Sequence, residues 1–196
     1  MGLQSTGMVE VRAAPGVFSV PSARSVSVLF TRAVSHYDAL ADTWNEARDA
    51  RRYCGDSPVV CHPPCRGWGR LSHFANVCPG ELDLARFAVA QVRRVGGVLE
   101  HPAWSRLWVD QSLPLPGVRD AFGGWTLPID QIWFGHRARK ATWLYICGLE
   151  PMEAPLLPLS FDAPVKPVER MGRAERERTP VALASWLVDL ASRCRL

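Results

Sequence analysis

The sequence has no long hydrophobic run, no internal repeat and very little lysine. No stretch of about 18 apolar residues occurs, which excludes an ordinary membrane-spanning helix. No period recurs along the 196 residues, which excludes collagen-like, coiled-coil and repeat architectures. Lys140 and Lys166 are the only lysines, so the net charge of +4 rests on arginine. GC-rich coding alone can produce such an arginine excess, which is therefore weak support for a nucleic-acid partner.

The sequence also lacks a secretory signal and a Cys-x-x-Cys pair. With six cysteines and no such signal, we expect reduced thiols in a cytoplasmic protein that has no membrane partner. The composition, 47% hydrophobic and 21% charged, predicts one globular domain. We expect a flexible leader at 1–25 and a single α/β domain at 26–196, with a proline-rich connector at 149–169 and a C-terminal helix.

Short apolar runs alternate with helical patterns along the chain. Runs rich in β-branched and aromatic residues predict strands at 26–30, 59–61, 98–99 and 143–147. Apolar residues at helical spacing predict helices at 35–50, 79–95 and 180–193. This alternation predicts an α/β fold, with a Rossmann-like, mostly parallel sheet flanked by helices.

Three polar segments lie at the ends of these predicted strands. They are residues 61–69, 100–102 and 135–140. In open α/β sheets, ligands bind outside the carboxyl ends of the strands. We therefore expect the chemistry of the protein to lie in these segments.

Cys65 is the candidate nucleophile of the first segment. The rigid Pro63-Pro64 turn would fix its backbone, and Arg66 would favour the thiolate by lowering the pKa of the thiol. Most free cysteines are instead small, buried and unreactive. The residues around Cys65 leave both interpretations open.

Glu100 is the candidate acid of the second segment. A carboxyl group placed directly after an apolar strand is costly to bury unless it is paired or protonated. With a raised pKa, Glu100 could exchange a proton with a ring nitrogen of a substrate. The alternative is a structural carboxylate that faces Arg106 or Arg139.

Together the three segments resemble the cytosine-C5 DNA methyltransferases. Pro63-Pro64-Cys65, followed by Trp68, is similar to the nucleophile motif of that family, and 98–102 (Val-Leu-Glu-His-Pro) is similar to its glutamate motif. Residues 135–148 resemble its Gln-x-Arg-x-Arg segment and the strand after it. The resemblance covers about residues 26 to 148, and the whole pattern also resembles small phage and prophage proteins.

The resemblance implies a methyltransferase-like fold and a specific division of labour. Cys65 would add to C6 of cytosine, Glu100 would hold N3 protonated, and Arg139 would steady the base or a phosphate. A methyl group from S-adenosylmethionine would then go to C5. The remaining substrate-binding residues would be Pro64, Arg66, Trp68, His101, Pro102, Arg137 and Lys140. The partner would be DNA or a cytosine nucleotide, with a positive groove formed by Arg66, Arg70, Arg137 and Arg139.

The chain departs from the family at the methyl-donor loop. The family has a glycine-rich loop there, whereas residues 30–35 contain no glycine. By position, Phe30, Thr31 and Asp49 are the candidate donor-binding residues. The family's glutamine has no clear equivalent before 137, and 149–169 is too short for a target-recognition domain. We therefore expect any choice of target sequence to depend on a separate target-recognition protein.

Two other functions remain open from the sequence. One is a zinc site, because cysteines and histidines are zinc ligands and six of them lie close together: Cys54, Cys61, His62, Cys65, His73 and Cys78. The other is a relative without activity that binds nucleic acid or a partner protein. The glycine-free loop at 30–35 favours this second alternative.

Overall fold

The computed structural model describes residues 25–69, 72–160, 163–167 and 170–196. Nearly all of the leader expected at 1–25 therefore lies outside the described residues, as do Arg70 and parts of the connector. Among the described residues, no helix is long and apolar enough to cross a membrane.

The core of the fold is a six-stranded sheet with the strand order β2-β1-β3-β4-β6-β5. The strands are β1 (Ser27–Thr31), β2 (Asp42–Asn45), β3 (Val59–Cys61), β4 (Gly97–Pro102), β5 (Trp125–Asp130) and β6 (Ala141–Cys147). The first four strands are parallel to one another. β6 lies between β4 and β5 and runs antiparallel to both. The expected α/β fold is confirmed, with a sheet that is mixed but largely parallel.

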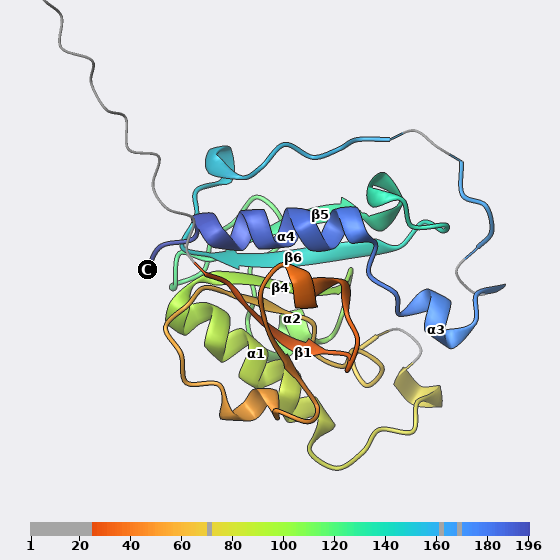
Figure 1. Ribbon diagram of the computed structural model, residues 1–196, viewed down its shortest axis with the longest axis horizontal. Helices are drawn as coiled ribbons and strands as arrows, with labels where there is room; N and C mark the ends of the chain where they lie inside the picture. The colour runs from red at the N-terminus through yellow and green to blue at the C-terminus, as the bar shows by residue number, and fades with distance from the viewer. Residues whose placement is uncertain (1–24, 70–71, 161–162, 168–169) are drawn as a thin grey trace, which may run out of the picture.

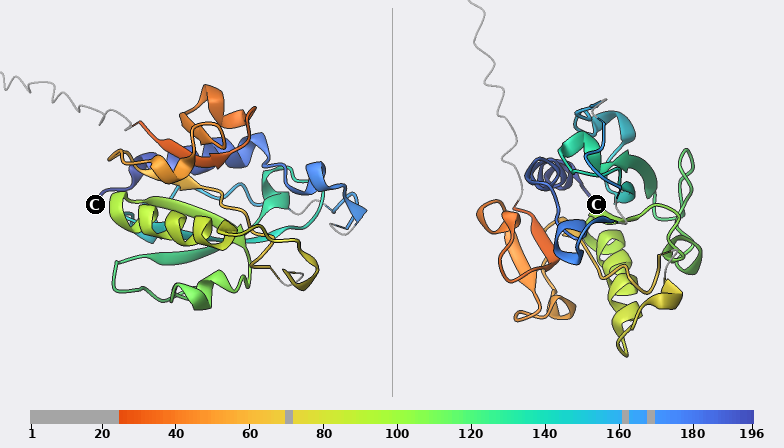
Figure 2. Two further views of the ribbon diagram at one scale, coloured as in Figure 1. Left: turned by 90° about the horizontal axis from the view of Figure 1, so that it is seen from below. Right: turned by 90° about the vertical axis from the view of Figure 1, so that its right-hand side faces the viewer.

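Two helices cover opposite faces of this sheet, α1 (Glu81–Val95) and α4 (Val181–Arg193) (Figures 1 and 2). Val28 and Val98 face α4, whereas the next residues along the strands, Leu29 and Leu99, face α1. This alternation explains why consecutive residues in the middle of both strands are apolar. The short helices are α2 (Leu107–Asp110) and α3 (Arg173–Arg176), with 3-10 turns η1 (His36–Ala39), η2 (Ala50–Arg52), η3 (Ser72–Phe74), η4 (Gln131–Phe134) and η5 (Pro151–Glu153).

The helix predicted at 35–50 is wrong. Ser35 and Asp38 form a capping box, but the helix that they start ends after the single turn η1. The chain then extends, and Thr43 and Trp44 pair with β1 as strand β2. Threonine and tryptophan favour strands, and the open edge of β1 supplies the partner that makes this preference decisive.

β5 was not predicted, and β6 was not expected to run antiparallel. Pro128 lies within β5 and obscures its strand pattern. The sheet tolerates this proline because β5 is an edge strand, where one side needs no hydrogen-bond donor.

Candidate active site

The three polar segments meet at one edge of the sheet. The first follows β3, the second ends β4, and β4 and β3 are parallel neighbours. The third precedes β6, whose amino end lies beside the carboxyl end of β4 because Pro102 pairs with Thr142 in antiparallel register. The reversal of β6 is therefore what brings the third segment to the site.

Glu100 lies at the centre of this site and is held through both of its carboxylate oxygens. The Oε2 atom lies 3.0 Å from Nδ1 of His62, and Oε1 accepts a hydrogen bond of 3.0 Å from Nε2 of Gln131. Gln131 also donates to Thr142 Oγ1, at 3.1 Å. The Glu100 side chain is only 13% exposed, so these partners fix its position.

A tyrosine extends this arrangement away from the carboxylate. The Tyr37 hydroxyl lies 2.7 Å from Nε2 of His62. Burial, followed by the negative charge of Glu100, raises the pKa of Tyr37 well above its ordinary value, so the phenol keeps its proton. When Tyr37 donates that proton to Nε2, Nδ1–H of His62 points at Glu100. Tyr37, His62 and Glu100 thus form a hydrogen-bonded chain into the site.

The raised pKa expected for Glu100 is wrong. Burial would raise it, but the hydrogen bond from His62 and the positive charge of Lys140 outweigh burial and lower the pKa to about 2. Glu100 is therefore a carboxylate at neutral pH, and any proton that it delivers must come from a neighbour. His62 Nδ1 is the neighbour in place to supply it.

Cys65 is exposed on the loop after β3, but Arg66 does not favour its thiolate. Arg66 instead forms a bidentate ion pair with Glu81 of α1. Desolvation and the charge of Glu100 raise the pKa of Cys65, and the charge of Lys140 opposes them. The pKa of Cys65 is therefore raised overall, contrary to the lowering expected from Arg66, and Lys140 offsets only part of this rise.

Lys140 thus connects the nucleophile to the acid. Its positive charge helps to lower the pKa of Glu100 and reduces the rise in the pKa of Cys65, which places all three groups within one electrostatic environment. Arg139, which was expected to act beside it, has a side chain that is 66% exposed and pairs with Asp130 at 3.5 Å. Of the two neighbouring cations, Lys140 is the one that influences the site.

Other residues predicted to contact substrate have structural surroundings instead. His101 is fully buried on the opposite face of the sheet from Glu100, against Trp108. Trp68 is buried in the core on the α1 side, which leaves no free ring face for a base. Pro64 and Pro102 are half-buried at the ends of their segments.

The predicted positive groove is largely neutralised. Arg66, Arg137 and Arg139 each pair with an acidic residue, Glu81, Glu175 and Asp130 respectively. Arg70 lies outside the described residues.

The residues predicted to hold the methyl donor do not form a cradle. Phe30 has a left-handed backbone, with φ at 66°, and its ring packs edge-on against Phe87. Asp49 accepts two hydrogen bonds of 2.8 Å from the guanidinium of Arg51. Thr31 offers a buried hydroxyl that has no partner among the described residues. One orphaned hydroxyl is too little to hold S-adenosylmethionine, so these three residues do not fit that donor.

The zinc interpretation also fails for the six residues considered. In the described part of the chain, no three histidine, cysteine or acidic side chains gather closely enough to hold a metal ion. Cys61 is buried in β3, and His62 is hydrogen-bonded to Glu100 and Tyr37.

Comparison of this chain with protein-family models, with curated proteins and with solved structures finds no match. The function therefore has to be argued from the site itself.

Proposed function

We propose that this chain is a cytosine-C5 methyltransferase-like enzyme, in which Cys65 adds to C6 of a cytosine in DNA or in a nucleotide. The observation that carries the proposal is the meeting of two groups at the carboxyl edge of the sheet: the exposed Cys65 on the loop after β3, and Glu100 on the neighbouring parallel strand β4, held by His62 and Gln131. The strand order supports it, because an antiparallel strand between the last two strands of a parallel sheet is typical of methyltransferase-like folds.

The residues of the site have distinct roles in this proposal. Cys65 gives its proton to solvent, and the thiolate, which the charge of Lys140 stabilises, forms a bond to C6 while the electron pair of the C5–C6 double bond moves into the ring. N3 takes a proton that the imidazolium form of His62 supplies from Nδ1 through Glu100, and this proton returns when the thiolate leaves. C5 then has the electron density to attack an electrophile. Loss of the C5 proton and departure of the thiolate restore the ring.

The resemblance implies that S-adenosylmethionine supplies the methyl group. Because the predicted donor residues do not fit this cofactor, the steps above involve only the protein and the base. A separate target-recognition protein remains part of the proposal, since the chain has no room for such a domain between 149 and 169.

The exchange of the C5 hydrogen tests the cysteine chemistry without any donor. When the thiolate adds and leaves in D2O, C5 takes up deuterium from the solvent. We expect wild-type protein to deuterate C5 of deoxycytidine in a single-stranded oligonucleotide, as read by nucleoside mass spectrometry. Cys65→Ala should abolish the exchange, and Glu100→Gln should slow it by about 100-fold or more, the usual range for losing general acid–base catalysis.

Cys54→Ala is the matched control, because Cys54 is also exposed but lies outside the site. It should exchange at the wild-type rate. Deuterium uptake that persists in Cys65→Ala, or its absence from wild type with all cytosine substrates, would overturn the proposal.

A binding protein without transfer activity is the second candidate. Two observations favour it. The Asp49 carboxylate is already hydrogen-bonded to Arg51, and Phe30 has a left-handed backbone, so neither residue helps to form a binding site for a methyl donor. This candidate predicts that Cys65→Ala binds oligonucleotide as wild type does and that neither protein exchanges C5.

A further inference from the structure

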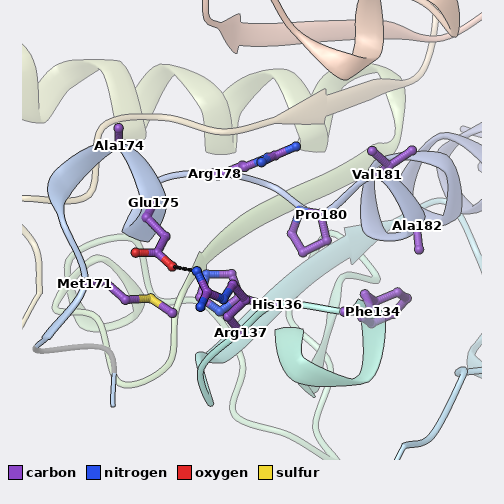
Figure 3. A pocket seen from close by; sticks show the side chains of 11 residues that line it. Phe134, His136, Arg137, Met171, Ala174, Glu175, Arg178, Pro180, Val181 and Ala182 are labelled. Atoms are coloured by element: carbon purple, nitrogen blue, oxygen red, sulfur yellow. Dashed lines mark hydrogen bonds and ion pairs between the residues drawn. The ribbon is translucent and has the colours of Figure 1, made fainter. Parts of the chain in front are cut away.

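A pocket of about 610 Å³ lies beside the candidate active site, between the loop at 135–137, α3 and the start of α4 (Figure 3). Phe134, Met171 and Val181 give it apolar walls. Its volume is typical of small-molecule sites. The mechanism proposed above uses none of these residues.

His136 brings an unsatisfied polar atom to this pocket. The residue is only 7% exposed, and Nε2 is buried without a partner among the described residues. Nδ1 is held against the backbone of Ala138, 2.8 Å from its carbonyl oxygen and 3.1 Å from its amide nitrogen. When Nδ1 accepts the amide hydrogen, or when the ring is protonated and Nδ1 donates to the carbonyl oxygen, Nε2 carries a hydrogen that it can donate. Because His136 lines a pocket, unlike the core ring of His101, a bound acceptor can satisfy this atom.

The amino end of α4 supplies further donors. Pro180 occupies the N-cap position, and no side chain caps this end of the helix. Pro180, Val181 and Ala182 all line the pocket, and Figure 3 shows them at the point where α4 begins. The free amides of a first helical turn and the helix dipole together favour an anion.

The charged residues of the pocket also favour an anion. Arg137 and Arg178 line it, and Arg178 has no ion-pair partner in the described part of the chain. The acidic lining residue is Glu175, which is shared between Arg137 at 2.9 Å and Lys166 at 2.5 Å. Two lining arginines and this nearby lysine against one carboxylate leave the pocket positive.

We propose that this pocket binds the phosphate of the substrate nucleotide, through His136 Nε2, the first amides of α4 and Arg178. The choice of a nucleotide rests on the function proposed above, whereas the preference for an anion does not. The pocket adjoins the site, because Arg137 and Lys140 are three positions apart in the chain, so their Cα atoms lie at most about 11 Å apart. The charge of Glu177, just beyond α3, also reaches Cys65.

Binding of matched ligands tests this proposal. Deoxycytidine, deoxycytidine monophosphate and a short single-stranded oligonucleotide with one cytosine are titrated by calorimetry. We expect the monophosphate to bind at least about tenfold more tightly than the nucleoside, since about two charge-assisted hydrogen bonds are gained. Arg178→Gln should remove most of this advantage. Arg176→Gln, at the last residue of α3 and two positions before Arg178 but outside the pocket lining, should keep it.

The outcomes separate the two proposals. If the nucleoside binds as tightly as both phosphate-bearing ligands, or if Arg178→Gln changes nothing, the phosphate pocket is wrong even where C5 exchange occurs. If Arg178-dependent binding is found without exchange, the pocket stands and the proposed chemistry fails. Sensitivity to Arg178→Gln with the oligonucleotide but not with the monophosphate would identify the strand backbone as the source of the phosphate. His136→Gln, tested for folding by its thermal transition, should weaken binding in the same way.

Discussion

Glu100 and His101 are neighbours on β4 whose side chains point to opposite faces of the sheet. Although both are buried, Glu100 is charged and His101 is neutral. Glu100 stays charged because His62 and Gln131 hydrogen-bond both oxygens and Lys140 supplies a positive charge. His101 has no partner for either ring nitrogen among the described residues. Burial, opposed only in part by the charge of Glu100, lowers the pKa of His101 to about 4. It is therefore a neutral ring within the core.

This difference predicts how stability depends on pH. Between the ordinary pKa of His101, 6.5, and its folded value of about 4, the unfolded chain takes up a proton that the folded chain refuses. Stability should therefore fall as the pH falls through this window, by on the order of 3 kcal/mol in total. Glu100, whose pKa is lowered from 4.5 to about 2, contributes only below the ordinary value. Urea midpoints measured between neutral pH and pH 5 or so thus report His101 in preference to Glu100.

His101→Phe removes the titrating ring and should flatten this dependence. Because both ring nitrogens lack partners, an apolar ring of similar size leaves no new unsatisfied group. His36→Gln, at an exposed position, is the control and should keep the wild-type slope. Equal slopes in wild type and His101→Phe would show that His101 does not titrate in this way.

The sequence predicted the two reactive residues of the site but not the residues that support them. Cys65 and Glu100 could be found because each lies close to the carboxyl end of a short apolar run, which is a local pattern. Tyr37 and Gln131 come from turns far from Glu100 in the chain, and only the folded sheet brings them to it. Gln131, in η4, donates to Glu100 although the sequence showed no clear equivalent of the family's glutamine.

At the scale of elements, the pairing of β3 with β4 depends on a close approach at Gly97. Gly97 has φ at 125°, and a Cβ built there would lie 2.0 Å from the carbonyl oxygen of Val59. No side chain fits in this space, and the left-handed backbone disfavours other residues as well. The strands β3 and β4, which position Cys65 and Glu100, thus depend on a glycine for their spacing.

Gly97→Ala should therefore destabilise the protein by more than about 3 kcal/mol, because backbone has to move in the centre of the sheet. Gly117→Ala is the control, with φ at 86° and no atom within 4 Å of the added Cβ. It should cost only about 1 kcal/mol of backbone strain. The free energies of unfolding come from urea titrations, and similar values for both variants would contradict the argument.

The elements that were missed show where local patterns fail. α1 was predictable because Glu81 and Asp83 begin it, Arg93 and Arg94 end it, and Gly96 stops it. β2 and β5 are the two edge strands. β2 has a single large apolar residue, Trp44, so its pairing with β1 and not its own pattern makes it a strand. β5 alternates Trp125, Leu127 and Ile129 with other residues, but Pro128 interrupts the pattern.

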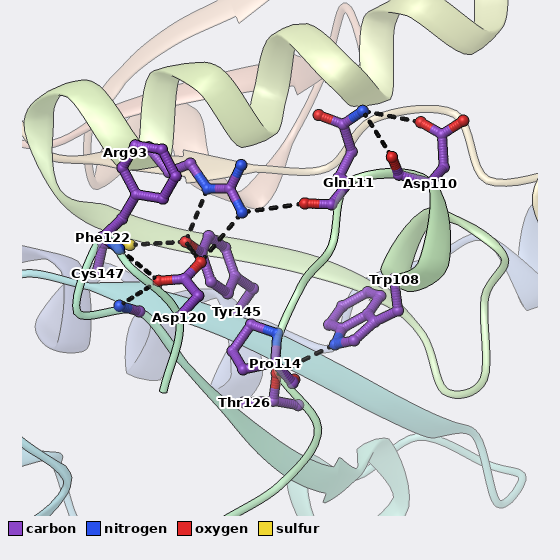
Figure 4. Close-up of polar contacts among 11 residues, drawn as sticks. Arg93, Trp108, Asp110, Gln111, Pro114, Asp120, Phe122, Thr126, Tyr145 and Cys147 are labelled. Atoms are coloured by element: carbon purple, nitrogen blue, oxygen red, sulfur yellow. Dashed lines mark hydrogen bonds and ion pairs between the residues drawn. The ribbon is translucent and has the colours of Figure 1, made fainter. Parts of the chain in front are cut away.

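At the scale of the whole molecule, the edge opposite the site is fixed by a buried polar network. Tyr145 Oη of β6 donates to Asp120 Oδ2 at 2.6 Å, and Arg93 of α1 donates to both residues at 3.0 Å (Figure 4). Cys147 also donates to Tyr145 Oη. Burial would raise the pKa of Asp120, but the hydrogen bonds from Tyr145 and from the amides of Gly124 and Phe122 lower it. The loop before β5 is thereby fastened to α1 and to the sheet.

We expect this network to contribute to stability but not to function. Asp120→Asn should cost about 1–3 kcal/mol, because it weakens charge-assisted bonds to the part-buried Arg93 and Tyr145. It should leave nucleotide binding and C5 exchange unchanged, because the network and the site lie toward opposite ends of β4. Cys147, which belongs to the network, pairs with Gly97 at the amino end, whereas the site lies at the carboxyl end, near Pro102. Asp110→Asn is the matched control: Asp110 pairs with the more exposed Arg86 and should cost less than about 1 kcal/mol. Urea unfolding and calorimetry on the same preparations measure both properties. A loss of binding in Asp120→Asn at temperatures where it is fully folded would show that the two edges are coupled.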